Sequence, residues 1–214
     1  MGIKRTRKKA LLIGLTGNIA CGKSTVAKIL KRTGIPIVDA DHVSREVCKK
    51  GSPVLKQIAV QLSLDVFTKA GTLDRKKLRK LVFSDSKKRK ILEKIMHPAI
   101  KKRSEASFRD LFKKGHPLVI YEASLLIETG RQKNFDGILL VTSPEKDQLK
   151  RIKKRDPSIS AKLAQKMICA QMPQLKKMQY ADWVIQNCTT LDELQDKVTR
   201  WIDFVLNTSW ARKT

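Results

Sequence analysis

The sequence of 214 residues has no long apolar run, because its apolar stretches are only a few residues long, and we expect no membrane-spanning helix. Its four cysteines are scattered without a C-x-x-C pair, so neither a disulfide framework nor a zinc site is indicated. Thiols of this kind are typical of a reducing compartment, and we expect a cytoplasmic protein. Aromatic residues make up only 5%, which leaves few stacking surfaces for single-stranded nucleic acid.

Acidic residues are few compared with basic ones. The chain has 46 Lys and Arg against 20 Asp and Glu, which gives a formal net charge of +26. A field of this sign attracts nucleic acid, anionic membranes or multiply phosphorylated small molecules, although solvated helix faces would also account for many of the charges. Because charge alone gives weak and non-specific attraction, we expect small-molecule substrates, no membrane partner and no specific nucleic-acid partner.

The basic start of the chain precedes a short apolar run and so has the general pattern of a secretory signal. Cleavage there would destroy the glycine-rich loop that follows, so we interpret residues 1–9 as a basic leader. Met1-Gly2 with Thr6 also fits the loose myristoylation pattern, but so short a match is weak evidence.

Linkers and repeats are absent too, and short apolar runs alternate with longer stretches of helical period. This alternation predicts an α/β fold with a parallel sheet, and continuous apolar strands are expected where helices cover both sheet faces. About eighty residues of helical period separate the second strand from the third, which predicts a helical insertion that can hold an acceptor substrate. Strands are expected near residues 10–15, 35–40, 118–121, 137–142 and 183–186.

Several helices have recognisable start signals. Ser52-Pro53 and Ser143-Pro144 each supply a hydroxyl for the N-cap, followed by proline at the first helical position. Thr190 and Glu193 form a capping box before the last helix. The apolar stripe expected on that helix consists of Leu191, Leu194, Val198 and Ile202.

Residues 17–24, GNIACGKS, match the full phosphate-binding loop pattern, with an apolar strand before and a helix after. Glycines let backbone N–H groups wrap a phosphate, and the following helix points its positive end at the same anion. Lys23 is expected to reach the β- and γ-phosphates of ATP, and the Ser24 hydroxyl to hold Mg²⁺. The predicted ATP-binding residues of the loop are Gly17, Asn18, Ile19, Ala20, Cys21, Gly22, Lys23, Ser24 and Thr25.

The motifs of two other nucleotide-binding classes, the NKxD of switch GTPases and the serine-glycine-glycine signature of ABC-type ATPases, are missing. Instead, Asp39 and Asp41 follow Lys23 by 16 and 18 residues, at the carboxyl end of the second predicted strand. A carboxylate there can orient an acceptor hydroxyl, accept its proton or hold magnesium through water. A helix cap or a salt bridge is the alternative role for Asp39.

Arg151 and Arg155 lie four residues apart, on one face of a predicted helix. Guanidinium groups placed in this way can close over a nucleotide and neutralise charge on the transferring phosphoryl group. Spacing alone leaves a solvated basic helix as an equal alternative.

Taken together, these segments resemble the dephospho-coenzyme A kinase family, from about residue 11 to 205. The resemblance rests on GLTGNIACGKSTVA, GIPIVDADHVSREV, GTLDRKKLRKLVF, HPAI, QLKRIKKRD, AQMP and ADWVIQN, in family order and spacing. It implies magnesium-dependent transfer of the ATP γ-phosphate to the ribose 3′-hydroxyl of dephospho-coenzyme A. It also implies a three-layer P-loop kinase fold with a five-stranded parallel sheet, a core of residues 10–42, 117–144 and 181–207, a helical coenzyme A-binding insertion of 43–116, and a helical lid of 145–180.

The resemblance also assigns roles to single residues. Lys23, Asp41 and Arg151 are the implied catalytic residues, with Asp41 facing the acceptor hydroxyl. The implied substrate-binding residues are Asp39, Asp41, His97 and Glu122, and Arg155 and Asn187 join the loop in binding ATP. A packed core position stays open for His97, and the oligomeric state is expected to be a monomer or weak oligomer.

Two residues depart from the family pattern. Glu122 stands where the family often has aspartate, which puts any water-mediated contact to magnesium in doubt. Cys21 stands where serine is common, and a thiol at a helix N-terminus can have a lowered pKa, so we expect its oxidation or alkylation to block ATP binding. Two other functions stay open: a kinase of another nucleoside-like acceptor, and a basic nucleic-acid-binding protein on an inactive P-loop fold.

Overall fold

A computed structural model describes residues 10–62 and 64–208, so the basic leader expected over residues 1–9 lies outside the described part. The described residues divide into two compact units: unit 1, residues 10–37 and 111–208, and unit 2, residues 38–62 and 64–110. Among the described residues, no helix has the length and apolar character needed to cross a membrane.

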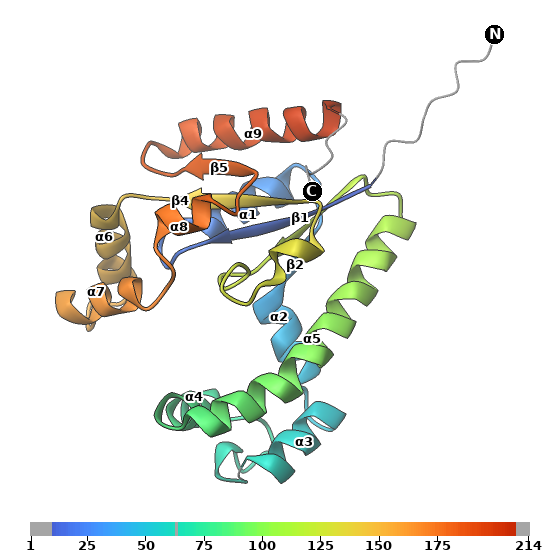
Figure 1. The fold of residues 1–214 in the computed structure, drawn as a ribbon, viewed down its shortest axis with the longest axis vertical. Helices are drawn as coiled ribbons and strands as arrows, with labels where there is room; N and C mark the ends of the chain where they lie inside the picture. The colour runs from blue at the N-terminus through green and yellow to red at the C-terminus, as the bar shows by residue number, and fades with distance from the viewer. Residues whose placement is uncertain (1–9, 63, 209–214) are drawn as a thin grey trace. The chain divides into compact units, whose positions relative to one another are not determined.

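A five-stranded sheet has the strand order β2-β3-β1-β4-β5. The strands β1, β2, β4 and β5 are labelled in Figure 1. β1 pairs in parallel with β3 and β4, and β4 pairs in parallel with β5. All five expected strands are present, and the parallel α/β class is confirmed. The strands are β1 (Leu11–Gly17), β2 (Ile37–Asp39), β3 (Leu118–Glu122), β4 (Gly137–Thr142) and β5 (Trp183–Gln186).

The main core of unit 1 lies between the sheet and two helices, α1 (Lys23–Arg32) and α9 (Leu191–Asn207). Alternate residues of β1 point to this face, and apolar residues at helical spacing on α1 and α9 meet them. The Thr190 hydroxyl accepts from the Glu193 N–H at 3.3 Å, as the capping box predicts. Leu191 is 57% exposed, so the apolar stripe expected on this helix begins at Leu194.

Two aspartates hold neighbouring strands in register. Asp136 precedes β4 and Asp182 precedes β5. A carboxylate oxygen of Asp136 accepts from the Leu12 N–H at 2.8 Å, and one of Asp182 accepts from the Ile138 N–H at 2.8 Å. In each pair the aspartate N–H donates in return to the carbonyl of the same partner residue. Each aspartate therefore forms two hydrogen bonds with one residue of a neighbouring strand.

The remaining helices of unit 1 follow β4. These are α6 (Glu145–Arg155), α7 (Ala161–Cys169) and α8 (Gln174–Met178), and a short 3₁₀ helix, η2 (Arg131–Asn134), precedes the strand. α6 and α7 share a small apolar cluster formed by Ile152, Ala164 and Ile168. This pair corresponds to the segment for which the sequence predicts a lid, a role that stays a prediction.

Unit 2 is helical and has its own apolar cluster, which includes Leu55, Ile58, Val66 and Ile95. Its α3 helix has Ser52 at the N-cap, accepting from the Leu55 N–H at 3.1 Å, as the Ser-Pro signal predicts. The helices are α2 (Ala40–Val47), α3 (Pro53–Gln61), η1 (Leu64–Val66), α4 (Arg75–Ser84) and α5 (Ser86–Lys113), whose last turn belongs to unit 1.

Candidate active site

The phosphate loop lies between β1 and α1, as its motif requires. Ala20 and Gly22 have positive φ angles of 58° and 93°, which turn the backbone sharply before the helix. Along the part of the chain that the structure describes, no side chain caps the first turn of α1. Its N-terminal N–H groups therefore keep the arrangement that binds an anion.

Lys23 and Glu122 form an ion pair beside the loop. Lys23 is the first residue of α1 and Glu122 the last of β3, and both side chains are nearly buried, with exposed fractions of 13% and 11%. Glu122 therefore stands at the loop, and its carboxylate is the counter-charge of the lysine that is expected to meet the phosphates.

Arg151, on α6, binds three separate segments around the loop. Its guanidinium donates to the Ala20 carbonyl at 3.1 Å, to the Ser143 hydroxyl at 3.0 Å and to the Asn187 carbonyl at 3.1 Å. The forked donors of arginine make such a three-way contact possible. Arg155, which is exposed one turn later, shares none of these contacts.

The Ser143 hydroxyl does not cap α6, so the start signal read at Ser143-Pro144 is wrong. The helix begins at Glu145, and no side-chain hydrogen bond caps it among the described residues. Ser143 is 3% exposed and its hydroxyl accepts from Arg151 instead. A local Ser-Pro pattern cannot reveal this because the competing donor, Arg151, lies eight residues further along the chain.

Asn187 also contacts the loop directly. Its side-chain amide donates to the Cys21 carbonyl at 2.8 Å, and a Cβ added to Gly22 would fall 1.9 Å from the same amide nitrogen. The loop and the segment after β5 thus touch at a position where only glycine fits.

Sequence reasoning missed the segment between α7 and α8, which contains the AQMP run. The Gln171 side-chain carbonyl accepts from the Ile19 N–H at 2.6 Å, and the Met172 carbonyl accepts from the Asn18 amide at 3.1 Å. Two neighbouring loop residues are therefore held by two neighbouring residues of this segment. AQMP stood out in the sequence as part of the family resemblance, but nothing in its composition indicated contact with the loop.

Lys177 and Glu128 form a second ion pair, at 2.7 Å. Lys177 is fully buried, and Glu128 Oε1 also accepts from the Met172 N–H at 3.4 Å. A buried ammonium needs such a partner, because desolvation of an unpaired charge is costly. Through Glu128, the pair therefore also holds the backbone of the AQMP segment at Met172.

Cys21 does not have the activated thiol that its place before α1 suggests. Its side chain is fully buried in the main core, and this burial raises the pKa of the thiol, although Lys23, Lys177 and Arg151 act in the opposite direction. Desolvation outweighs the helix terminus and the neighbouring cations. The prediction of a lowered pKa is wrong, and the oxidation or alkylation expected to block ATP binding loses its physical basis.

Unit 2 carries the other expected site residues. Asp39 caps α2, and its carboxylate accepts from the Asp41 N–H at 2.8 Å and from the His42 N–H at 3.4 Å. Asp41 is exposed in the first turn of that helix. His97 is exposed on α5, so the alternative of a packed core histidine is wrong.

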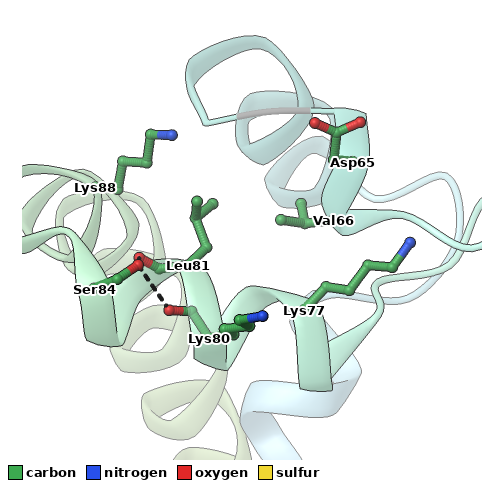
Figure 2. Close-up of a pocket in the computed structure, with 7 residues that line it drawn as sticks. All are labelled: Asp65, Val66, Lys77, Lys80, Leu81, Ser84 and Lys88. Carbon is green, nitrogen blue, oxygen red and sulfur yellow. Dashed lines mark hydrogen bonds between the residues drawn. The ribbon is translucent and has the colours of Figure 1, made fainter.

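A basic pocket of about 320 Å³ lies within unit 2 (Figure 2). Val66 and Leu81 are its apolar lining, and the side chains of Lys77 and Lys88 project at its sides. Such a mixture of aliphatic surface and ammonium groups suits an anion that carries apolar groups. The remaining lining residues are Asp65, Lys80 and Ser84.

Among the residues of the loop, Ser24 is the one that would hold a magnesium ion. Ser24 lies exposed in the first turn of α1, directly after the lysine. Magnesium in nucleotide sites takes one or two protein oxygens and completes its shell with phosphate oxygens and water. The Ser24 hydroxyl is a donor of this type.

The parallel sheet and the phosphate loop between β1 and α1 define the class of P-loop nucleotide-binding proteins. Within that class, a family model described as dephospho-CoA kinase matches residues 11–193, and the chain belongs to this family. The resemblance noted in the sequence is confirmed, and the chain is a phosphotransferase.

Curated relatives cover most of the chain. A dephospho-CoA kinase of Geobacter metallireducens is 40% identical over 88% of this chain and 93% of that protein. One of Arabidopsis thaliana is 37% identical over 90% of this chain and 87% of that protein.

Solved structures agree in fold. A Thermus thermophilus protein has a TM-score of 0.78 and 32% identity over 92% of this chain and 99% of its own. Dephospho-CoA kinase from Campylobacter jejuni has a TM-score of 0.70 and 27% identity, over 91% and 96% of the two chains. The three-layer α/β fold expected from the sequence is confirmed.

Proposed function

We propose that this protein transfers the γ-phosphate of ATP to the ribose 3′-hydroxyl of dephospho-coenzyme A, the last step of coenzyme A synthesis. The observation that carries the proposal is the loop itself, in which Lys23, the uncapped first turn of α1 and the nearby Arg151 meet in a chain of this family. The protein acts in the cytoplasm as a monomer or weak oligomer.

The chain's own residues divide the work. Lys23 exchanges its Glu122 partner for phosphate oxygens when ATP binds, and Arg151 stabilises the loop and the developing charge. Asp41 faces the acceptor hydroxyl and orients it, taking up the proton as the phosphoryl group leaves ATP. Arg155 and Asn187 contribute to the binding of ATP. Asp39, His97 and Glu122 contribute, with Asp41, to the binding of the acceptor substrate. When bound at Ser24, magnesium neutralises charge on the phosphates.

The test is an acceptor panel. Purified protein is incubated with Mg-ATP and dephospho-coenzyme A, nucleosides or shikimate-like alcohols, and ADP release is followed for each. Turnover is expected with dephospho-coenzyme A and not with the others. Turnover with another nucleoside-like acceptor alone would show that this acceptor is the substrate. The absence of turnover with dephospho-coenzyme A under any divalent metal would overturn the proposal.

Two substitutions test the assigned roles in the same assay. Lys23→Ala should lose nearly all of the rate, because the loop then lacks the ammonium for the transferring phosphate. Asp41→Asn should lower kcat more than it weakens ATP binding, since its contact is with the acceptor. A wild-type kcat in Asp41→Asn would remove Asp41 from the acceptor site.

A further inference from the structure

We propose that Gln171 is a positioning residue for phosphoryl transfer, which holds the Ile19 N–H so that the phosphate loop keeps the shape that receives ATP. The inference rests on the proposed function, because it concerns the nucleotide half of the same site. It adds a residue that touches neither reacting group and acts only through the loop backbone.

The hydrogen bond joins distant parts of the chain. Ile19 and Gln171 are 152 residues apart in sequence, and the Ile19 N–H to Gln171 Oε1 distance is 2.6 Å. Ile19 directly precedes Ala20, whose positive φ of 58° is unfavourable for a residue other than glycine. A strained loop of this kind persists only where its surroundings fix it, and Gln171 supplies an acceptor at the turn.

Apolar residues of the loop pack against α6 and α7, the two helices that precede Gln171 in the chain. Ile19 and Ala20 pack against the cluster that Ile152, Ala164 and Ile168 form between α6 and α7. Gln171 follows the end of α7 by two residues, so polar and apolar contacts to Ile19 come from one continuous segment. The turn of the phosphate loop is therefore shaped by this segment as well as by the glycines of the loop.

The segment that carries Gln171 is itself anchored. Glu128 accepts from the Met172 N–H and pairs with the fully buried Lys177, the fourth residue of α8. Met172, the residue directly after Gln171, is thus held through its N–H and also through its carbonyl, which accepts from the Asn18 amide. Gln171 is thus preorganised, so little conformational entropy is lost when its amide binds the loop.

The decisive variant is Gln171→Met, which keeps the length of the side chain and removes the acceptor. The expected result is a loss of about tenfold in Mg-ATP affinity by calorimetry, the factor that one hydrogen bond of ordinary strength represents. KM for ATP should rise while KM for the acceptor stays unchanged. The matched control is Gln165→Met on α7, since the Gln165 amide binds Glu145 and not the loop.

A second readout does not depend on catalysis. In the nucleotide-free protein, hydrogen exchange at the Ile19 N–H should be faster in Gln171→Met than in wild type. It should remain slow in Gln171→Glu, which keeps the acceptor oxygen, and become fast in Gln171→Asn, which is one methylene shorter. This comparison decides the question even if Gln171→Met does not fold.

The outcomes are distinct. Unchanged ATP affinity in folded Gln171→Met, or equal Ile19 exchange in all variants, would overturn the positioning role. A loss of thermal stability that fully accounts for weaker binding, with KM for both substrates raised together, would do the same. Failure of wild-type protein to phosphorylate dephospho-coenzyme A would contradict the proposed function, while the ATP and exchange measurements still test Gln171.

Discussion

Gly22 shows how one residue can be fixed by two separate constraints. Its φ of 93° lies in the left-handed region, where a side chain is strained, and its missing Cβ leaves room for the Asn187 amide. Gly34, just after α1, has a similar φ of 83° but has no atom within 4 Å of an added Cβ. A substitution at Gly34 therefore introduces backbone strain alone, whereas a substitution at Gly22 introduces strain and a steric clash.

We expect Gly34→Ala to lower the free energy of unfolding by about 1–2 kcal/mol, the cost of a left-handed non-glycine residue. Gly22→Ala should cost about 1–3 kcal/mol more, because the new methyl displaces the Asn187 amide from the Cys21 carbonyl. Chemical denaturation of both variants measures the difference. Equal losses would show that the Asn187 contact contributes nothing to stability.

Cys21 shows the limit of local reasoning at this scale. Its position before a helix pointed to a reactive thiol, but Cys21 is fully buried in the core shared with α1 and α9. Burial is a property of what packs around a residue, and no neighbour in sequence reports it. Of the four cysteines, only Cys169 and Cys188 are exposed.

At the scale of elements, the sheet is held in register by side chains as well as by its own ladder. Asp182 binds the Ile138 N–H, and Ile138 is fully buried in β4. An N–H at that depth needs an acceptor, and the Asp182 carboxylate supplies it directly before β5 begins. The ADWVIQN run thus contains a structural aspartate directly before its strand.

Asp182→Ala is expected to lower the free energy of unfolding by about 1–3 kcal/mol, the cost of leaving a buried donor unsatisfied. Asp203→Ala is the matched control: Asp203 is exposed on α9, and the change should stay within about 0.5 kcal/mol. Urea denaturation followed by circular dichroism measures both. A loss in Asp182→Ala no larger than in Asp203→Ala would contradict the role of this carboxylate.

Across the whole molecule, the positive charge is unevenly distributed. Residues 74–103, which cover most of α4 and α5, hold 13 Lys and Arg against 3 Asp and Glu. The basic pocket lies in this stretch and in the adjoining η1. ATP and dephospho-coenzyme A are both polyanions, so a concentrated positive field raises their local concentration.

We expect the pocket lysines to do more than contribute to the general field. Replacing Lys77, Lys80 and Lys88 together by alanine should weaken binding of dephospho-coenzyme A about tenfold and leave ATP affinity within about twofold, because only the acceptor would contact the pocket. The charge-matched control replaces three other exposed lysines of unit 2: Lys49, Lys50 and Lys56.

Calorimetry at low and high salt distinguishes the two contributions. High salt should abolish the small effect of the control triple, since it screens charges that act at a distance. It should preserve part of the effect of the pocket triple. Equal effects of both triples at every salt concentration would show that the pocket is not a contact site for the acceptor.

The sequence alone was sufficient for the strands, the phosphate loop and the kinase family, because these depend on local patterns: apolar runs, glycine spacing and motifs in fixed order. It also placed Lys23 correctly at the start of a helix. Tertiary structure decided what surrounds the loop. Gln171, Met172, Arg151 and Asn187 reach it from segments more than 130 residues away, through hydrogen bonds that depend on how the chain packs. The same packing buried Cys21 and raised its pKa, since desolvation depends on every atom nearby and not on the neighbouring residues of the sequence.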